Sequence, residues 1–126
     1  MHGLSKGGNY LNFGDFGIQA LDRDWITARQ IEAVRLAVTS RIPKDAKMWM
    51  RIFPDKPISK KPLETRMGKG KGDTEQWVAV VRPGRIIVEF SGCDEKTAKY
   101  IAHIVSAKLP IKSRFVSRKL ESEAAL

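Results

Sequence analysis

Hydrophobic residues recur with two different periods along this chain, and the two periods predict an ordered series of helices and strands. After Thr27, apolar residues at Ile31, Val34 and Val38 follow helical spacing with polar residues between them. Thr27 and Gln30 match a capping box, in which each side chain bonds a backbone N–H that the first turn leaves unpaired. Because proline disfavours helical geometry in the residue before it, this amphipathic helix is expected to end before position 43.

A second amphipathic helix is predicted between Asp94 and Pro110. Asp94 is a favoured capping residue for the start of the helix, and Pro110 cannot continue it. Lys108 lies in the expected last turn, where a cation complements the helix dipole. Helical spacing predicts one buried stripe, made of Ala98, Ile101, Ala102 and Val105.

Strands are predicted from alternating or continuous apolar runs bounded by Gly and Pro. They cover residues 10–18 (irregular, because glycines interrupt it), 47–53, 76–81, 85–90 and 111–116. Pro83-Gly84 is a turn signal, so 76–81 and 85–90 are expected to pair as an antiparallel hairpin. The order strand, helix, strand, long loop, hairpin, helix, strand indicates an α+β fold. It predicts a single compact domain with two helices and a mixed or antiparallel sheet.

Residues 54–73 are predicted to form one long basic loop. Prolines at 54, 57 and 62 argue against regular secondary structure there. Loops of this length are usually functional or disordered, and we expect this loop to be disordered in the free protein. The expected organisation is a flexible tail at 1–9, an α+β domain at 10–116 that contains the loop, and a polar tail at 117–126.

Positive charge is concentrated in two parts of the chain. The formal net charge is +9, and residues 41–71 contain ten Lys or Arg against three acids. A second cluster at 108–119 has five cations and no acid. Solubility alone would not require the positive charges to be clustered. The pattern therefore favours a polyanionic partner, and nucleic acid is the partner that it favours most. A membrane partner is disfavoured, because no apolar run approaches a membrane span and neither helix has a wide basic face beside bulky aromatics.

The glycine-rich run Gly68-Lys69-Gly70-Lys71-Gly72 invites comparison with a phosphate-binding loop. A Walker loop requires Ser or Thr after Gly-Lys and a helix behind it, whereas Gly72 and a predicted strand follow here. Nucleotide hydrolysis is therefore disfavoured. The run is either a solvated turn or a finger that contacts phosphates, and the neighbouring Arg66 favours the finger.

No other chemistry is supported by residue spacing. His2, His103 and Cys93 are scattered, so no metal site is expected, and the carboxylates form no recognisable acid/base pair. We therefore expect no enzyme activity, no cofactor and no small-molecule substrate. Cys93 is expected to be a small buried or half-buried residue and not a nucleophile, and a single cysteine suits a reducing compartment.

The three tryptophans have two possible roles. Trp25, Trp49 and Trp77 could stack on bases. Trp49 and Trp77 lie in apolar strands, which favours packing against the core. Trp25 precedes the first helix cap and is a candidate for a hydrophobic staple.

Six motifs occur in an order that is characteristic of one family. They are residues 27–33 (TARQIEA), 51–57 (RIFPDKP), 66–72 (RMGKGKG), 77–80 (WVAV), 83–85 (PGR) and 108–112 (KLPIK). On these motifs the chain resembles the bacterial-type ribosomal protein L-sixteen family of the large subunit, over roughly residues 13–116. Members usually begin with a longer, strongly basic tail that threads into rRNA. This chain begins Met1-His2-Gly3-Leu4, so that anchor is not expected here.

The resemblance implies an α/β-hammerhead type of α+β domain and a non-enzymatic role on the ribosome, in the cytoplasm or in an organelle. It implies binding to 23S-type rRNA near the aminoacyl-tRNA site, contact with tRNA, neighbouring large-subunit proteins and support of late subunit assembly. A free RNA-binding module acting outside the ribosome is the alternative. The implied RNA-contacting residues are Arg29 and Arg51 on the domain, Lys56, Lys60 and Lys61 at the edge of the loop, Arg66, Lys69, Gly70 and Lys71 within it, and Lys112 and Arg114 near the end.

Overall fold

Seven strands and two helices make up the part of the chain that a computed structural model describes, residues 8–60 and 74–119. In chain order they are β1 (Phe16–Ala20), β2 (Asp24–Thr27), α1 (Ala28–Thr39), β3 (Lys47–Met50), β4 (Lys56–Lys60), β5 (Thr74–Val81), β6 (Ile86–Ser91), α2 (Glu95–Ser106) and β7 (Ser113–Ser117).

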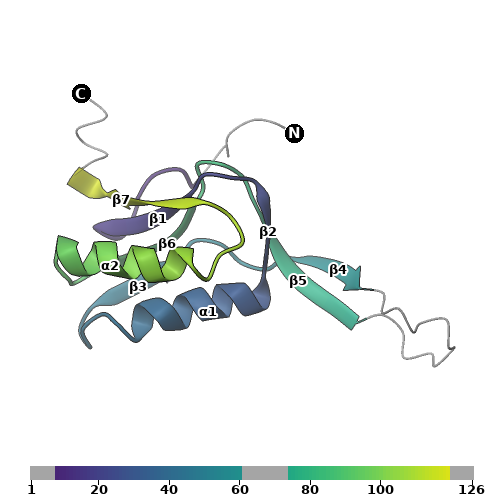
Figure 1. Cartoon of the computed structure of the whole chain (residues 1–126), viewed down its shortest axis with the longest axis horizontal. Helices are drawn as coiled ribbons and strands as arrows, with labels where there is room; N and C mark the ends of the chain where they lie inside the picture. The colour runs from purple at the N-terminus through teal and green to yellow at the C-terminus, as the bar shows by residue number, and fades with distance from the viewer. Residues whose placement is uncertain (1–7, 61–73, 120–126) are drawn as a thin grey trace, which may run out of the picture.

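The strands form two antiparallel sheets. Sheet A has the order β3-β6-β1-β7, and sheet B has the order β2-β5-β4. The two helices lie side by side on one face of sheet A, and β4 and β5 extend away from them as a ribbon (Figure 1). The predicted α+β class is confirmed, but the strands are divided between two sheets.

Both helices form where the sequence predicts them. Thr27 Oγ1 accepts from the Gln30 N–H at 3.1 Å, and Gln30 Oε1 accepts from the Thr27 N–H at 2.9 Å, so the capping box is present. Asp94 caps α2 by accepting from the Thr97 N–H at 2.9 Å. The buried stripes face sheet A and pack against Ile18, Val88 and Phe90. They consist of Ile31, Val34, Ala37 and Val38 on α1, and Ala98, Ile101, Ala102 and Val105 on α2.

The hairpin predicted between residues 76–81 and 85–90 is wrong. β5 pairs with β2 and β4, whereas β6 pairs with β1 and β3. Between them, the Gly84 N–H donates to the Ala20 carbonyl at 2.8 Å, and the Ala20 N–H donates to the Arg85 carbonyl at 2.8 Å. The turn is therefore bonded to the end of β1, and the chain passes from one sheet to the other.

The prolines of the basic segment do not prevent a strand there. β4 forms despite Pro57, which lies opposite Trp77 of β5. β4 is an edge strand of sheet B, and edge strands tolerate a residue that lacks an N–H donor. The remainder of the predicted loop, 61–73, lies outside the described residues, as does the prediction that it is disordered.

Other boundaries also differ from the sequence predictions. β1 begins at Phe16, and β3 ends at Met50. β2 is a short strand that was not predicted, because the residues before Trp25 are polar. β7 reaches Ser117, which is buried, so this residue belongs to the domain and not to the predicted tail.

Candidate RNA interface

Residues 8–14 lie across the face of sheet A that is turned away from the helices, which we call the outer face. Gly17, Glu89 and Val116 are directly opposite one another in adjacent strands and share this face. Leu11 is buried against Val116 and Ile86, and the Ile86 N–H donates to the Gly8 carbonyl at 2.6 Å. The described end of the predicted tail is therefore bound to the sheet.

Glu89 anchors this segment. Its side chain is fully buried in β6, and Oε1 accepts from the N–H groups of Phe13 at 2.8 Å and Gly14 at 2.7 Å. The Asn12 N–H lies 3.1 Å from the same oxygen, and Arg51 forms an ion pair with the other carboxylate oxygen. Burial alone raises the pKa of Glu89, but the hydrogen bonds from Gly14, Phe13, Asn12 and Arg51 outweigh it and the net pKa is lowered.

Arg51, predicted as an RNA contact, lies mostly inside the molecule. Its side chain is only 13% exposed, and its guanidinium contacts both Glu89 and the ring of Phe13, whose centroid is 5.5 Å from Cζ. The Arg85 guanidinium donates to the Arg51 carbonyl at 2.9 Å. These contacts give Arg51 a positioning role for the segment above it.

Four aromatic residues lie near Arg51: its guanidinium contacts the Phe13 ring and donates to the Tyr10 carbonyl at 3.4 Å, and Trp49 and Phe53 stand two residues before and after it in the chain. Tyr10, Phe13 and Phe53 are 70%, 57% and 75% exposed, and Trp49 is half-buried beneath Phe13. The rings of Phe13 and Trp49 are stacked, with centroids 5.9 Å apart and an interplanar angle of 24°. Phe53 also borders a cleft of about 480 Å³, which Arg51 and Arg85 line. The sequence prediction missed this surface; its signal was the aromatic-glycine pattern at 13–17.

The predicted cations that can be located fall into two groups. Arg29 is exposed in the first turn of α1, and Lys56 is exposed at the base of the ribbon, with Nζ 5.2 Å from the centroid of the Trp25 ring. Thr27, at the start of α1, and Lys56 both lie opposite Val78 on either side of β5, so Arg29 and Lys56 belong to one region.

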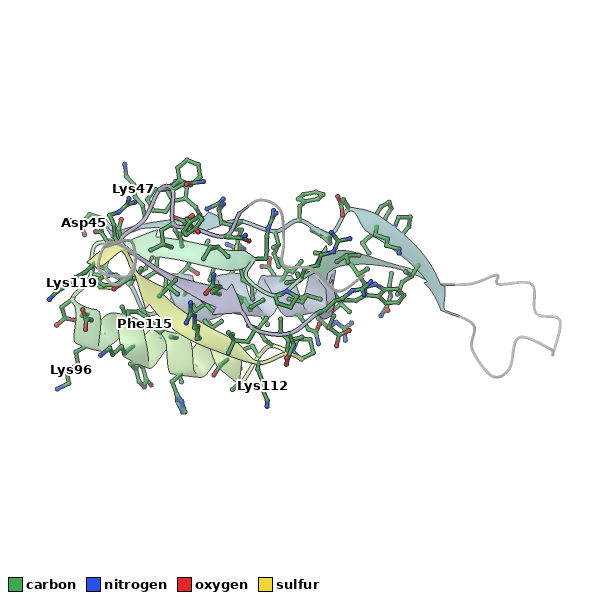
Figure 2. The ribbon with its side chains drawn as sticks, turned by 90° about the horizontal axis from the view of Figure 1, so that it is seen from above. Asp45, Lys47, Lys96, Lys112, Phe115 and Lys119 are labelled. Carbon is green, nitrogen blue, oxygen red and sulfur yellow. The ribbon has the colours of Figure 1, made fainter. Side chains whose placement is uncertain are left out.

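Lys112 and Arg114 form the second group, near β7 at the other edge of sheet A. Both are exposed, and Arg114 Nε donates to Gln19 Oε1 at 2.8 Å. Figure 2 shows Lys112 extending from the molecule below β7. The side chain of Lys60 is not described, and Lys61, Arg66, Lys69, Gly70 and Lys71 lie outside the described residues.

The tryptophans differ from one another in their surroundings. Trp49 stacks on Phe13 at the outer face and lies outside both core clusters, and Trp77 is 46% exposed, so the predicted packing of these two tryptophans against the core is wrong. Trp25 is 45% exposed and lies opposite Val80, while Ile26 occupies the buried position before the helix cap that a staple residue would take. Sheet B therefore carries two exposed tryptophans, Trp25 in β2 and Trp77 in the ribbon, as well as the cation Lys56.

Three further observations concern the described residues. Cys93 is half-buried, and burial, together with the charges of Asp94 and Asp15, raises the pKa of its thiol. Within residues 8–60 and 74–119, no three His, Cys, Asp or Glu side chains gather in a way that could hold a metal ion. None of the helices in these ranges is both long and apolar enough to cross a membrane.

Comparison with known families defines the class of protein to which this arrangement belongs. A model of ribosomal proteins, described as ribosomal protein L16p/L10e, matches residues 1–116. The chain belongs to this family, whose members are large-subunit ribosomal proteins, and rRNA binding and translation are typical of it. It is 56% identical over 119 residues to the large ribosomal subunit protein uL16 of Heliobacterium modesticaldum, covering 94% of this chain and 83% of that protein.

Proposed function

We propose that this protein is a structural constituent of the large ribosomal subunit that binds 23S-type rRNA near the aminoacyl-tRNA site, contacts tRNA and supports late subunit assembly. Family membership supports the ribosomal part of this proposal. The resemblance of residues 66–72 and 51–57 to the L-sixteen motifs supports the location, together with a hammerhead type of fold.

The observation that carries the proposal is the placement of the ribbon. β4 and β5 extend away from the helices, so Lys60 and Thr74 are far from the body of the domain (Figure 1). The thirteen residues between them contain Lys61, Arg66, Lys69 and Lys71, against the two acids Glu64 and Asp73. A basic segment attached at such a point can approach phosphates without interference from the domain.

The remaining predicted cations extend the interface over the domain. We assign Arg29 and Lys56 to rRNA phosphates at the root of the ribbon, and Lys112 and Arg114 to phosphates beside β7. Arg29, Lys56 and Arg114 are exposed on helices or strands, and Lys112 is exposed directly before β7, where its N–H donates to Asp22 at 3.1 Å, so all four are held in defined positions, as phosphate contacts that fix an orientation require. Arg51 acts indirectly in this arrangement, because its guanidinium is engaged by Glu89 and Phe13.

Sedimentation of the tagged full chain tests the proposal. Wild type is compared with the triple change Arg66→Ala, Lys69→Ala, Lys71→Ala, and with a control pair, Lys96→Ala and Lys99→Ala, on the exposed surface of α2. Wild type and the control pair are expected to move with large subunits in a sucrose gradient. The triple variant is expected either to leave the subunit or to give subunits that bind aminoacyl-tRNA weakly. Wild type remaining at the top of the gradient would contradict the proposal.

A further inference from the structure

We propose that Phe13, together with Trp49 and Lys47, binds one unpaired nucleotide of RNA, whose base stacks on the Phe13 ring. This inference rests on the proposed function and adds a base-stacking site to the phosphate contacts. The site lies away from the ribbon: Lys47 is at the opposite end of the molecule from β4 (Figure 2).

Phe13 is held outside the core by a rigid support. Its own N–H and those of its neighbours Asn12 and Gly14 donate to the buried Glu89. Gly14 fits closely, since a Cβ there would lie 2.8 Å from the Phe90 carbonyl oxygen. The backbone under Phe13 is therefore fixed by four strong contacts around one carboxylate, counting the Arg51 ion pair.

The ring of Phe13 is oriented as well as exposed. Trp49 stacks with it at 5.9 Å between centroids, and the Arg51 guanidinium lies 5.5 Å from its centroid. The side chain is nevertheless 57% exposed, so much of it is accessible to solvent. An aromatic ring that is held in place and largely accessible to solvent is suited to stack on a base.

Lys47 supplies a cation on the same face of β3 as Trp49. Lys47 and Trp49 are alternate residues of β3, so they share a face, about 7 Å apart along the strand. Lys47 is exposed and points away from the body (Figure 2). A base on Phe13 therefore places its phosphate within reach of the Lys47 ammonium. Asp45, two residues before Lys47, is also exposed and its negative charge opposes this contact, so Asp45→Asn is expected to strengthen binding.

A purely structural role for Phe13 would be to cover the Arg51–Glu89 ion pair. The two roles are separated by substitution. Leucine keeps an apolar cover but has no aromatic face, whereas tyrosine keeps both. Phe13→Leu should therefore lower RNA affinity while leaving the melting temperature close to that of wild type, and Phe13→Tyr should leave both unchanged. Tyr100→Leu, at a 56% exposed aromatic on α2, is the matched control.

The test uses the full chain and a single-stranded RNA dodecamer with one central 5-bromouridine, beside the same sequence closed in a duplex. Irradiation is expected to cross-link the single strand to the peptide containing Phe13 or Trp49, with little cross-linking of the duplex. Phe13→Leu is expected to weaken binding about fivefold or more. Equal binding and cross-linking by wild type, Phe13→Leu and Tyr100→Leu would overturn the inference.

Sedimentation separates this outcome from failure of the proposed function. If wild type enters large subunits and Phe13→Leu enters equally, with no change in cross-linking to rRNA, the stacking site is refuted while the ribosomal role stands. If the dodecamer cross-links to Phe13 but wild type stays at the top of the gradient, the stacking site is supported and the ribosomal role is refuted.

Discussion

Arg51 and Glu89 form a nearly buried ion pair that links β6 and the residues just after β3 to the N-terminal segment on the outer face. Glu89 is fully buried, and Arg51 is 13% exposed. An isolated buried charge is costly, but here the carboxylate also accepts three backbone N–H groups. The pair therefore fixes residues 12–14, and with them Phe13, in a defined position.

The ion pair predicts a specific dependence of stability on pH. Because the pKa of Glu89 is lowered in the folded protein, its contribution to stability is complete above the unfolded pKa, about 4.3, and is lost as pH falls through the lower folded value. Glu89→Gln should cost about 3 kcal/mol at neutral pH, because Arg51 is left uncompensated. The difference in free energy of unfolding between wild type and Glu89→Gln should then shrink as pH falls below the unfolded pKa of about 4.3. Parallel pH profiles from denaturant titrations would contradict this.

Gly14 is expected to be intolerant of any side chain. A Cβ at this position would lie 2.8 Å from the carbonyl oxygen of Phe90 and 2.9 Å from its nitrogen, and both are backbone atoms. Gly14→Ala should destabilise the domain by about 1–3 kcal/mol, since backbone must shift to admit the methyl group. Asn12→Ala is the control, because it leaves the Asn12 N–H available to Glu89. Thermal melting of the two variants checks the prediction, and equal melting temperatures would count against it.

The capping box at the start of α1 predicts a smaller effect. Thr27→Ala removes the oxygen that accepts from Gln30 and should cost about 1 kcal/mol. Thr27→Ser keeps the hydroxyl and should retain most of the stability. Chemical denaturation of the three proteins measures the difference, and a loss of the same size in Thr27→Ser would mean that packing of the threonine methyl, rather than capping, is responsible.

The exposed cations predict a change in the salt dependence of RNA binding. Removing Arg29 and Lys56 together, or Lys112 and Arg114 together, should reduce the slope of log affinity against log salt by about 1–2 for each pair. The paired changes Lys96→Ala and Lys99→Ala on α2 should leave the slope unchanged. Filter binding to a 23S-type rRNA fragment at several salt concentrations provides the measurement. A slope that is insensitive to both pairs would remove them from the interface.

Local patterns predicted the helices because their determinants are close in sequence. Thr27 with Gln30, and Asp94 with the apolar stripe that follows it, are short-range signals that tertiary structure did not override. The turn at Pro83-Gly84 was also local, but its hydrogen bonds go to Ala20, more than sixty residues away. No local pattern specifies such a partner, so the hairpin prediction failed.

The positive charge of the candidate interface could be predicted from the sequence, but the positions of its side chains could not. The clustering of Lys and Arg indicated the partner, whereas the placement of Arg51 depended on Glu89, a single acid within the apolar run of β6. A lone carboxylate between Val88 and Phe90 was the available signal for a buried partner. Phe13 could not be assigned a role from the sequence. The residues that support it, Trp49 and Glu89, are 36 and 76 positions away in the chain.

β5 and β6 are consecutive in the chain, and each is an inner strand of its own sheet. The ribbon is thus continuous with the centre of the domain, while its far end is attached to nothing in sheet A. Adding one residue to each of β4 and β5 would lengthen the ribbon by about 3.4 Å and leave every contact of the helices intact. The length of the ribbon can therefore change without any change in the packing of the domain.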